Sequence, residues 1–247
     1  MTTWFISDLH LALEETRITA GFLDFLLEPQ NGDELYILGD FFNYWVGDDV
    51  EDEYADQIKQ ALKATSDRGV KLFIMHGNRD FLLGQDFCKQ SGCTLLNDPT
   101  LIQLAGEPCL LLHGDSLCTA DTEYQAFRKL ARSSEWQADF LGKPLADRVA
   151  YAESARKQSQ NYNSIKDDVM MDVTADAVQS ILDAHNCTRM IHGHTHRPSF
   201  HNWDHNGQAF ERIVLGDWYT HGYYLKIENH TFDMVKFDLP ETHSLQR

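Results

Sequence analysis

The chain has 247 residues, and its 38 acidic and 21 basic residues give a formal charge of −17 at neutral pH. Such an acidic protein repels nucleic acids and anionic lipid headgroups at long range, so no nucleic-acid partner is expected. The apolar runs are far shorter than the roughly 20 residues that span a bilayer, and a first strand predicted to begin by Thr3 leaves no room for a signal peptide.

Strand and helix signals alternate up to residue 115, a pattern that predicts a sheet covered by helices. Apolar residues at helical spacing predict a helix over 16–27, and a second helix is predicted over 53–67. The apolar runs 101–104 and 109–112 are typical of a β-hairpin. The five cysteines have no ligand-pair spacing, so we expect free, mostly buried thiols in a reducing cytosol.

Residues 119–170 break this alternation, because the stretch is long, charged and aromatic and carries no strand signal. We predict that it forms an inserted helical cap. Four of its polar residues share one helix face, and a face with two cations, a hydroxyl and an amide can hold phosphate and sugar oxygens. These residues are Arg156, Ser159, Asn163 and Lys166. A solvated helix face is the alternative interpretation of the same pattern.

The last part of the chain is predicted to begin with a helix near 175–184 and to continue with strands. The runs 199–203 and 209–214 flank an Asn-Gly turn, which is a strong hairpin signal. Two more strands, near 222–228 and 231–237, are expected to complete a second, antiparallel sheet.

Five short motifs rich in possible metal ligands each follow an apolar run of strand character. They are Asp8-Leu9-His10, Gly39-Asp40, Gly77-Asn78-Arg79-Asp80, His113-Gly114-Asp115 and Gly193-His194-Thr195-His196. Side chains just beyond strand ends can meet in one crevice even when they lie far apart in sequence. Any one of these motifs is common by chance, and a lone buried histidine is more often structural than ligating. We therefore base the prediction on their joint occurrence.

We predict that seven of these side chains hold two divalent metal ions. The first ion is assigned to Asp8, His10, Asp40 and His196, and the second to Asp40, Asn78, His113 and His194. Oxygen and nitrogen donors without a thiolate suit hard or borderline metals. Two divalent cations outweigh two carboxylates, and the excess positive charge can activate a water molecule against phosphorus. His76 and His192 are interpreted as packing or ligand-supporting groups.

These motifs resemble those of the calcineurin-like metallophosphoesterase superfamily. Longer stretches around them are similar to the UDP-2,3-diacylglucosamine diphosphatase family, and the similarity runs from about residue 3 to 238. The stretches are 4–11, 76–82, 113–119 and 193–198.

The resemblance implies an α/β (α+β) fold, a four-layer αββα sandwich of two mixed sheets in one domain over 1–247, with the helical cap inserted at 119–170. It implies hydrolysis of the diphosphate of UDP-2,3-diacylglucosamine at the α-phosphorus, giving UMP and 2,3-diacylglucosamine 1-phosphate (lipid X) in lipid A biosynthesis. The family is expected to use two Mn²⁺ ions per chain and to act as a peripheral protein on the cytoplasmic face of the bacterial inner membrane. No obligate protein partner is implied.

The resemblance places substrate contacts on ten residues. They are Asn78, Arg79, Asp121, Tyr124, Phe127, Arg156, Ser159, Asn163, Lys166 and His194. The apolar stripe that contains Tyr124 and Phe127 either packs in a core or, above an acylated substrate, lines acyl-chain grooves or enters the membrane interface. Asn43 stands where the family usually has a glutamate, so the surroundings of Asp40 are expected to differ.

Two other functions are compatible with parts of this pattern. The same chemistry would serve a phosphodiesterase or phosphatase acting on soluble nucleotides or phosphoproteins, in which case the apolar residues of the cap would only pack. A metal-free scaffold is the non-enzymatic alternative, and the intact set of ligands disfavours it.

Overall fold

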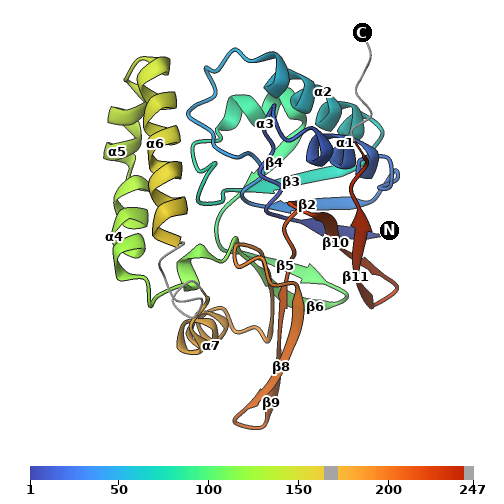
Figure 1. Cartoon of the computed structure of the whole chain (residues 1–247). Helices are drawn as coiled ribbons and strands as arrows, with labels where there is room; N and C mark the ends of the chain where they lie inside the picture. The colour runs from blue at the N-terminus through green and yellow to red at the C-terminus, as the bar shows by residue number, and fades with distance from the viewer. Residues whose placement is uncertain (164–171, 242–247) are drawn as a thin grey trace.

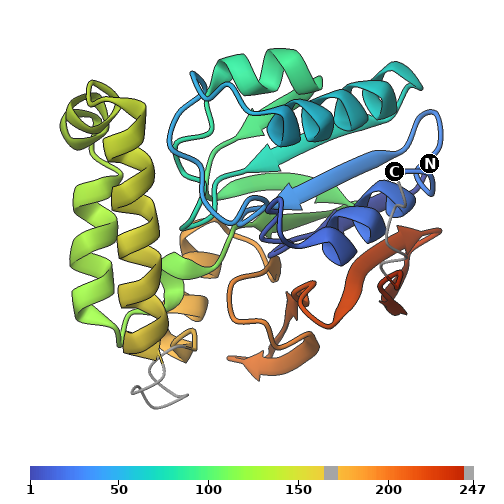
Figure 2. The same cartoon turned by 45° about the horizontal axis from the view of Figure 1, so that its top comes forward.

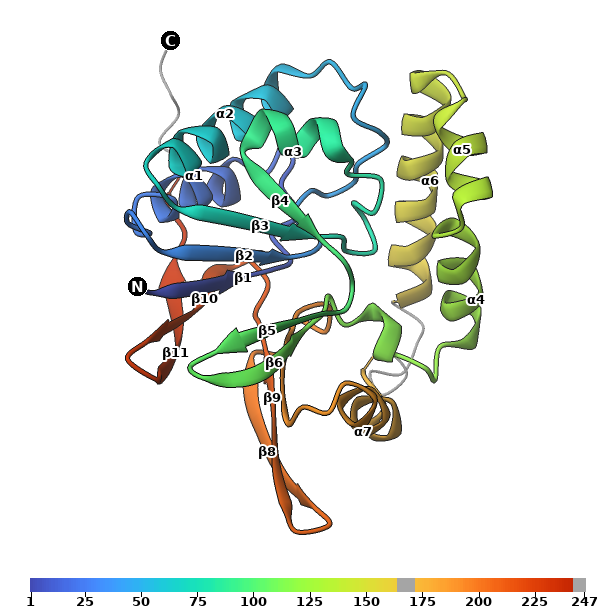
Figure 3. The same ribbon diagram turned by 180° about the vertical axis from the view of Figure 1, so that it is seen from behind.

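The structure is a computed structural model that describes residues 1–163 and 172–241. It contains two sheets packed against each other (Figures 1 and 3). The six-stranded sheet has the order β11-β10-β1-β2-β3-β4, and the five-stranded sheet has the order β5-β6-β7-β9-β8. The strands of the first sheet are β1 (Thr3–Ile6), β2 (Glu34–Leu38), β3 (Lys71–Met75), β4 (Cys93–Leu96), β10 (His221–Glu228) and β11 (Thr231–Asp238). Those of the second are β5 (Thr100–Leu104), β6 (Glu107–Leu111), β7 (Arg189–His192), β8 (Ser199–His205) and β9 (Gln208–Val214).

Helices cover the outer faces of both sheets, which gives the four-layer αββα sandwich that was predicted. Successive side chains of a strand face opposite sides, so each strand serves two cores. Trp4 and Ile6 pack toward the helices of the first sheet, whereas Phe5 packs between the sheets. Leu111 likewise faces the space between the sheets, while Leu110 packs against the helix that covers the second sheet. The covering helices are α1 (Thr16–Phe25), α2 (Glu53–Asp67) and α3 (Gln85–Ser91) on the first sheet and α7 (Ala175–Ala184) on the second.

The last two strands lie in a different sheet from the one expected. β10 pairs antiparallel with β1, with Trp4 opposite Lys226, and β11 pairs with β10. The second sheet is therefore completed by β5 to β9, and it is mixed rather than antiparallel, because β6, β7 and β9 run parallel. The expectation of a second antiparallel sheet ending in β10 and β11 was wrong, because chain order alone does not say which free edge a strand will join.

Three helices stand side by side next to the sandwich, on the side where the parallel strands end (Figures 1 and 2). They are α4 (Thr122–Ala131), α5 (Ser134–Leu141) and α6 (Leu145–Asn163). Side chains cap the first two: Asp121 accepts a hydrogen bond from the backbone N–H of Tyr124, and Ser133 accepts one from that of Trp136. We refer to α4, α5 and α6 as the cap helices.

Two further expectations concern cysteines and membrane-spanning segments. All five cysteines are free and buried, as their spacing indicated. Within residues 1–163 and 172–241, no helix has both the length and the apolar character needed to cross a bilayer.

Candidate metal centre

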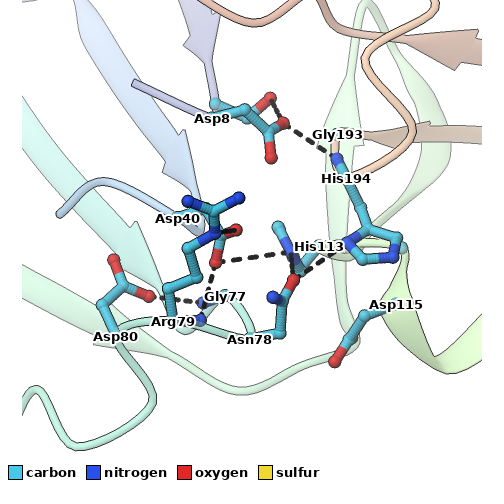
Figure 4. Close-up of polar contacts among 12 residues, drawn as sticks. Asp8, Asp40, Gly77, Asn78, Arg79, Asp80, His113, Asp115, Gly193 and His194 are labelled. Carbon is cyan, nitrogen blue, oxygen red and sulfur yellow. Dashed lines mark hydrogen bonds and ion pairs between the residues drawn. The ribbon is translucent and has the colours of Figure 1, made fainter. Parts of the chain in front are cut away.

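The predicted ligands lie where parallel strands end. Asp8 follows β1, Asp40 follows β2, Asn78 follows β3, and His113 and His194 follow the parallel strands β6 and β7. Because the carboxyl ends of parallel strands face the same way, these loops meet at one edge of the sandwich (Figure 4).

The backbone at this edge adopts an unusual conformation. Asp8, His10, Asp40, His194 and His196 all have positive φ angles, between 49° and 67°. This left-handed region is disfavoured for residues other than glycine, and such residues gather at functional sites where the surroundings hold them in place. Each of these residues thus turns the chain sharply at the point where its side chain enters the cluster.

Two glycines allow the loops to approach closely. A Cβ atom at Gly77 would lie 2.1 Å from the backbone nitrogen of Asp40, and one at Gly193 would lie 2.3 Å from Oδ2 of Asp8. Any larger residue would push the ligand-bearing loops apart, which explains why the motifs contain glycine at these positions.

The structure brings all seven predicted ligands together. Possible ligand atoms of Asp8, His10 and His196 lie within 4.8 Å of one another, and so do those of Asp8, Asp40 and His113. Asn78 joins the cluster, since its Oδ1 is 2.9 Å from Nε2 of His113 and 2.9 Å from Nδ1 of His194.

Asp40 occupies the middle of this cluster. Its Oδ2 is 3.8 Å from Nδ1 of His10, and its Oδ1 is 3.7 Å from Nε2 of His113. Each carboxylate oxygen therefore faces one of the two predicted groups of ligands. This is the arrangement that a bridging carboxylate requires.

The polar atoms of the cluster fit divalent cations. Ser7 Oγ and the backbone N–H of His194 donate to Oδ2 of Asp8, at 2.6 and 2.8 Å, whereas its buried Oδ1 has no well-aligned hydrogen bond among the described residues and lies 3.4 Å from Nε2 of His196. Nδ1 of His10 is likewise buried and has no hydrogen-bond partner among the described residues, with Oδ2 of Asp40 3.8 Å away. Buried polar atoms without partners are costly, and a bound cation would satisfy both. Divalent metal ions held here would supply positive charge for water activation and for stabilising a phosphoryl group.

Three acidic residues that were not singled out from the sequence support the cluster. Asp80 is fully buried and accepts hydrogen bonds from the backbone N–H groups of Phe41 and Gly77, at 2.7 and 2.8 Å, so it ties two ligand loops together. Asp217 Oδ2 lies 3.4 Å from Nδ1 of His196. The third, Asp115, is fully buried and accepts hydrogen bonds from Tyr124 and Arg128 of α4. Asp80 and Asp115 belong to the motifs named above, and this membership is the sequence signal that could have identified them. No sequence pattern identifies Asp217.

Comparison with known proteins agrees with this geometry. The family model for calcineurin-like phosphoesterase matches residues 1–198, which is most of the chain. The chain belongs to the calcineurin-like phosphoesterase family. Among its relatives, the protein named UDP-2,3-diacylglucosamine hydrolase from Chromohalobacter salexigens is 50% identical, covering 88% of this chain and 89% of that protein. The proteins of the same name from Marinobacter nauticus and Pseudomonas aeruginosa are 51% and 46% identical, covering 88% and 97% of this chain and 90% and 100% of theirs.

The phosphoesterase places some of the expected substrate contacts at the metal centre. The Arg79 guanidinium turns back over Asp40, with Nε 3.5 Å from Oδ2 (Figure 4). The Tyr124 ring on α4 is roughly parallel to the His194 ring, with centroids 6.3 Å apart. The Tyr124 side chain is thus a direct link between the cap helices and a predicted ligand.

The other expected contacts are placed less closely. Asp121 caps α4, and Phe127 is exposed on the same helix. Arg156 lies half-buried on α6, with its Nε buried and without an acceptor among the described residues. Lys166 and the side chains of Ser159 and Asn163 lie outside the described residues, so the predicted polar face of α6 stays a prediction.

A largely apolar cavity of about 370 Å³ borders the metal-centre loops of the phosphoesterase. Its walls come from four regions: the loop after β1, the loop after β2, the start of α2, and Val149 of α6. Leu11, Phe42 and Trp45 line it, and so does Asn43, which also contacts the guanidinium of Arg79. None of the seven predicted ligands lines the cavity, which reaches the metal-centre loops through Leu11 and Asn43.

Metal binding by this phosphoesterase should release a proton near neutral pH. Burial disfavours a charged imidazole, but the carboxylates of Asp40, Asp8 and Asp115 outweigh burial and raise the pKa of His113 to about 9. In the metal-free protein at pH 7 His113 therefore carries a proton that it must lose in order to coordinate. Affinity for the metal should rise as the pH increases from 7 to 9, by about tenfold per unit for one displaced proton.

Titration calorimetry in two buffers of different ionisation enthalpy measures the number of protons released when the metal binds. His194 provides the contrast, because burial and the charge of His113 lower its pKa to about 4, so it is already neutral at pH 7. The variant His113→Gln should bind metal more weakly and release less proton. Equal heats in both buffers at pH 7 would contradict the role assigned to His113.

Proposed function

We propose that this phosphoesterase hydrolyses the diphosphate of UDP-2,3-diacylglucosamine at the α-phosphorus, using two Mn²⁺ ions. Water adds to the α-phosphorus, the bond from that phosphorus to the bridging oxygen breaks, and UMP and 2,3-diacylglucosamine 1-phosphate are released. The observation that carries the proposal is the 46–51% sequence identity to relatives with this name over most of the chain, together with the clustered donor set.

The charges of the site support hydrolysis of an anion. Asp8 and Asp40 are the two carboxylates of the donor set, and the remaining donors are imidazoles and one amide. Divalent ions held by such a set keep an excess of positive charge for the diphosphate. Arg79 adds a fixed cation beside them, suited to two hydrogen bonds with one phosphate group. The proposed identity of the metal as Mn²⁺ follows from these oxygen and nitrogen donors and from the resemblance of the motifs.

The cavity and the cap helices support an acylated substrate. The apolar cavity lies beside Asn43 and thus close to Arg79, so an acyl chain can be buried while its sugar phosphate stays at the metal centre. Phe127, Leu130, Leu141 and Tyr151 are exposed apolar or aromatic side chains on the cap helices. We propose that they contact the cytoplasmic face of the inner membrane, because an acidic protein gains more there from apolar insertion than from charge.

Release of UMP from the acylated UDP-sugar tests this function. With Mn²⁺ we expect turnover that a chelator abolishes and added Mn²⁺ restores. The deacylated UDP-sugar should have a kcat/KM lower by at least about a hundredfold. Each CH₂ group of an acyl chain that is buried in the complex contributes about 0.8 kcal/mol of binding free energy, and the deacylated sugar lacks this contribution. Equal kcat/KM values for the two substrates would instead indicate an enzyme for soluble nucleotides, and absence of UMP would reject the proposal.

A further inference from the structure

Three groups surround the guanidinium of Arg79. Asp40 Oδ2 is 3.5 Å from its Nε, Asn43 Oδ1 accepts a hydrogen bond from its Nη1 at 3.2 Å, and the Tyr219 hydroxyl accepts another. The Arg79 side chain is 27% exposed, so part of the guanidinium stays open. Arginine is flexible and loses much rotamer freedom when it binds an anion. A guanidinium that is already held in place before the anion binds loses less rotamer freedom.

The side chain of Asn43 makes its polar contact with Arg79. It is 3% exposed, and its backbone N–H donates to the carbonyl of Leu11 at 3.0 Å, which fixes it in the loop after β2. Arginine has only donors, so the oxygen of the Asn43 amide must face Arg79, and Nδ2 faces away from it. Nδ2 is buried and has no acceptor among the described residues. The oxygen is thus the end of the side chain that makes a polar contact, and through it Asn43 acts on Arg79.

The amide also leaves the charge of Arg79 in place. Asp40 is the carboxylate paired with this guanidinium, and as the predicted bridging ligand it must also serve the metal ions. Neither Asn43 nor Tyr219 adds a negative charge, so both orient Arg79 without neutralising it. A guanidinium that is oriented and not neutralised binds a phosphate group most strongly.

We propose that Asn43 is a positioning residue that holds Arg79 for the phosphate of the substrate, with Tyr219 as the second support. This deepens the proposed function, on which its choice of substrate rests. The requirement at position 43 is then an acceptor oxygen toward Arg79. The unpartnered Nδ2 is dispensable.

The test is a double-mutant cycle with Arg79. Asn43→Leu keeps the shape and removes the acceptor, and it should lower kcat/KM by roughly 10- to 100-fold, the usual effect of losing a hydrogen bond to a charged group. Asn43→Asp keeps the acceptor but adds a negative charge beside the guanidinium, so its kcat/KM should fall between those of wild type and Asn43→Leu. In an Arg79→Ala background, adding Asn43→Leu should lower kcat/KM by less than about a further twofold. The effects of two residues that act through one contact are not additive.

Two controls separate positioning from a structural role. Metal content should be the same for Asn43→Leu and wild type, and Asn202→Leu on the exposed face of β8 should behave as wild type. The proposal is overturned if Asn43→Asp loses as much as Asn43→Leu, or if Asn43→Leu has its full effect without Arg79. If wild type releases no UMP from the acylated UDP-sugar, the proposed function fails. The double-mutant cycle is then measured with bis(p-nitrophenyl) phosphate as the substrate, and it still tests the role of Asn43.

Discussion

Replacing Asp40 with asparagine should lower kcat by at least about a thousandfold, or roughly 4 kcal/mol of activation free energy. The side chain is buried, and its two oxygens face His10 on one side and His113 on the other. An amide can offer one neutral oxygen, so it cannot bridge two cations. Turnover and metal content of the purified variant, measured together, should fall in parallel.

The stability of the same variant provides a second measurement. Burial raises the pKa of Asp40, with Asp8 also contributing and His113 and Arg79 opposing, so the carboxylate is a buried charge that the metal-free fold holds at a cost. Metal-free Asp40→Asn should therefore melt no lower than metal-free wild type, while the rise in melting temperature on adding Mn²⁺ should be lost.

Asp24→Asn, the same change on the exposed face of α1, is the matched control and should keep both activity and the Mn²⁺ effect. An Asp40→Asn protein that keeps two ions and normal turnover would show that Asp40 does not bridge them.

Replacing Arg128 with alanine should destabilise the protein by about 3 kcal/mol, the lower end of the usual cost of leaving a buried charge without its partner, because Asp115 keeps Nη2 of Arg132 at 3.7 Å. Arg128 on α4 donates from Nε to Asp115 Oδ2 at 2.8 Å and from Nη2 to Asp98 Oδ2 at 3.0 Å. Asp115 is fully buried and the side chain of Asp98 is 6% exposed, so neither carboxylate can be rehydrated in place. Thermal unfolding should show a fall of about 10 °C.

Activity should fall as well, because the same network joins the cap helices to the metal centre. The Tyr124 hydroxyl also donates to Asp115, at 2.5 Å, and Arg132 donates to the carbonyl of Gly77 at 2.8 Å, next to Asn78. Lys129→Ala, one residue further along α4 and exposed, should change neither property. A melting temperature for Arg128→Ala within about 2 °C of wild type would mean that the network contributes little.

The sequence indicated which side chains would cluster, because the motifs that carry the predicted ligands follow strands. A run such as Leu35 to Leu38 is recognisable by its apolar β-forming residues, and the Gly39-Asp40 pair behind it marks the strand end. Parallel strands carry such positions to one edge, whatever the details of the fold. The structure brings the seven side chains that the motifs predicted as ligands into one cluster.

The sequence was weaker wherever a partner had to be chosen across space. Periodicity identified β10 and β11 as strands, but pairing with β1 depends on which sheet edge the folded chain leaves free. Tyr219 follows β9 and stacks on His10, 5.1 Å away between ring centroids, yet no local pattern links two residues so far apart.

The chain by itself therefore determined what is periodic or contiguous: strands, helices, turns and the ligand motifs. The tertiary structure decided which buried polar groups meet, including Asn43 with Arg79 and Arg128 with Asp115. The physical reason is that propensity and periodicity act over a few neighbouring residues, whereas a hydrogen bond or ion pair forms wherever packing brings a donor within about 3 Å of an acceptor.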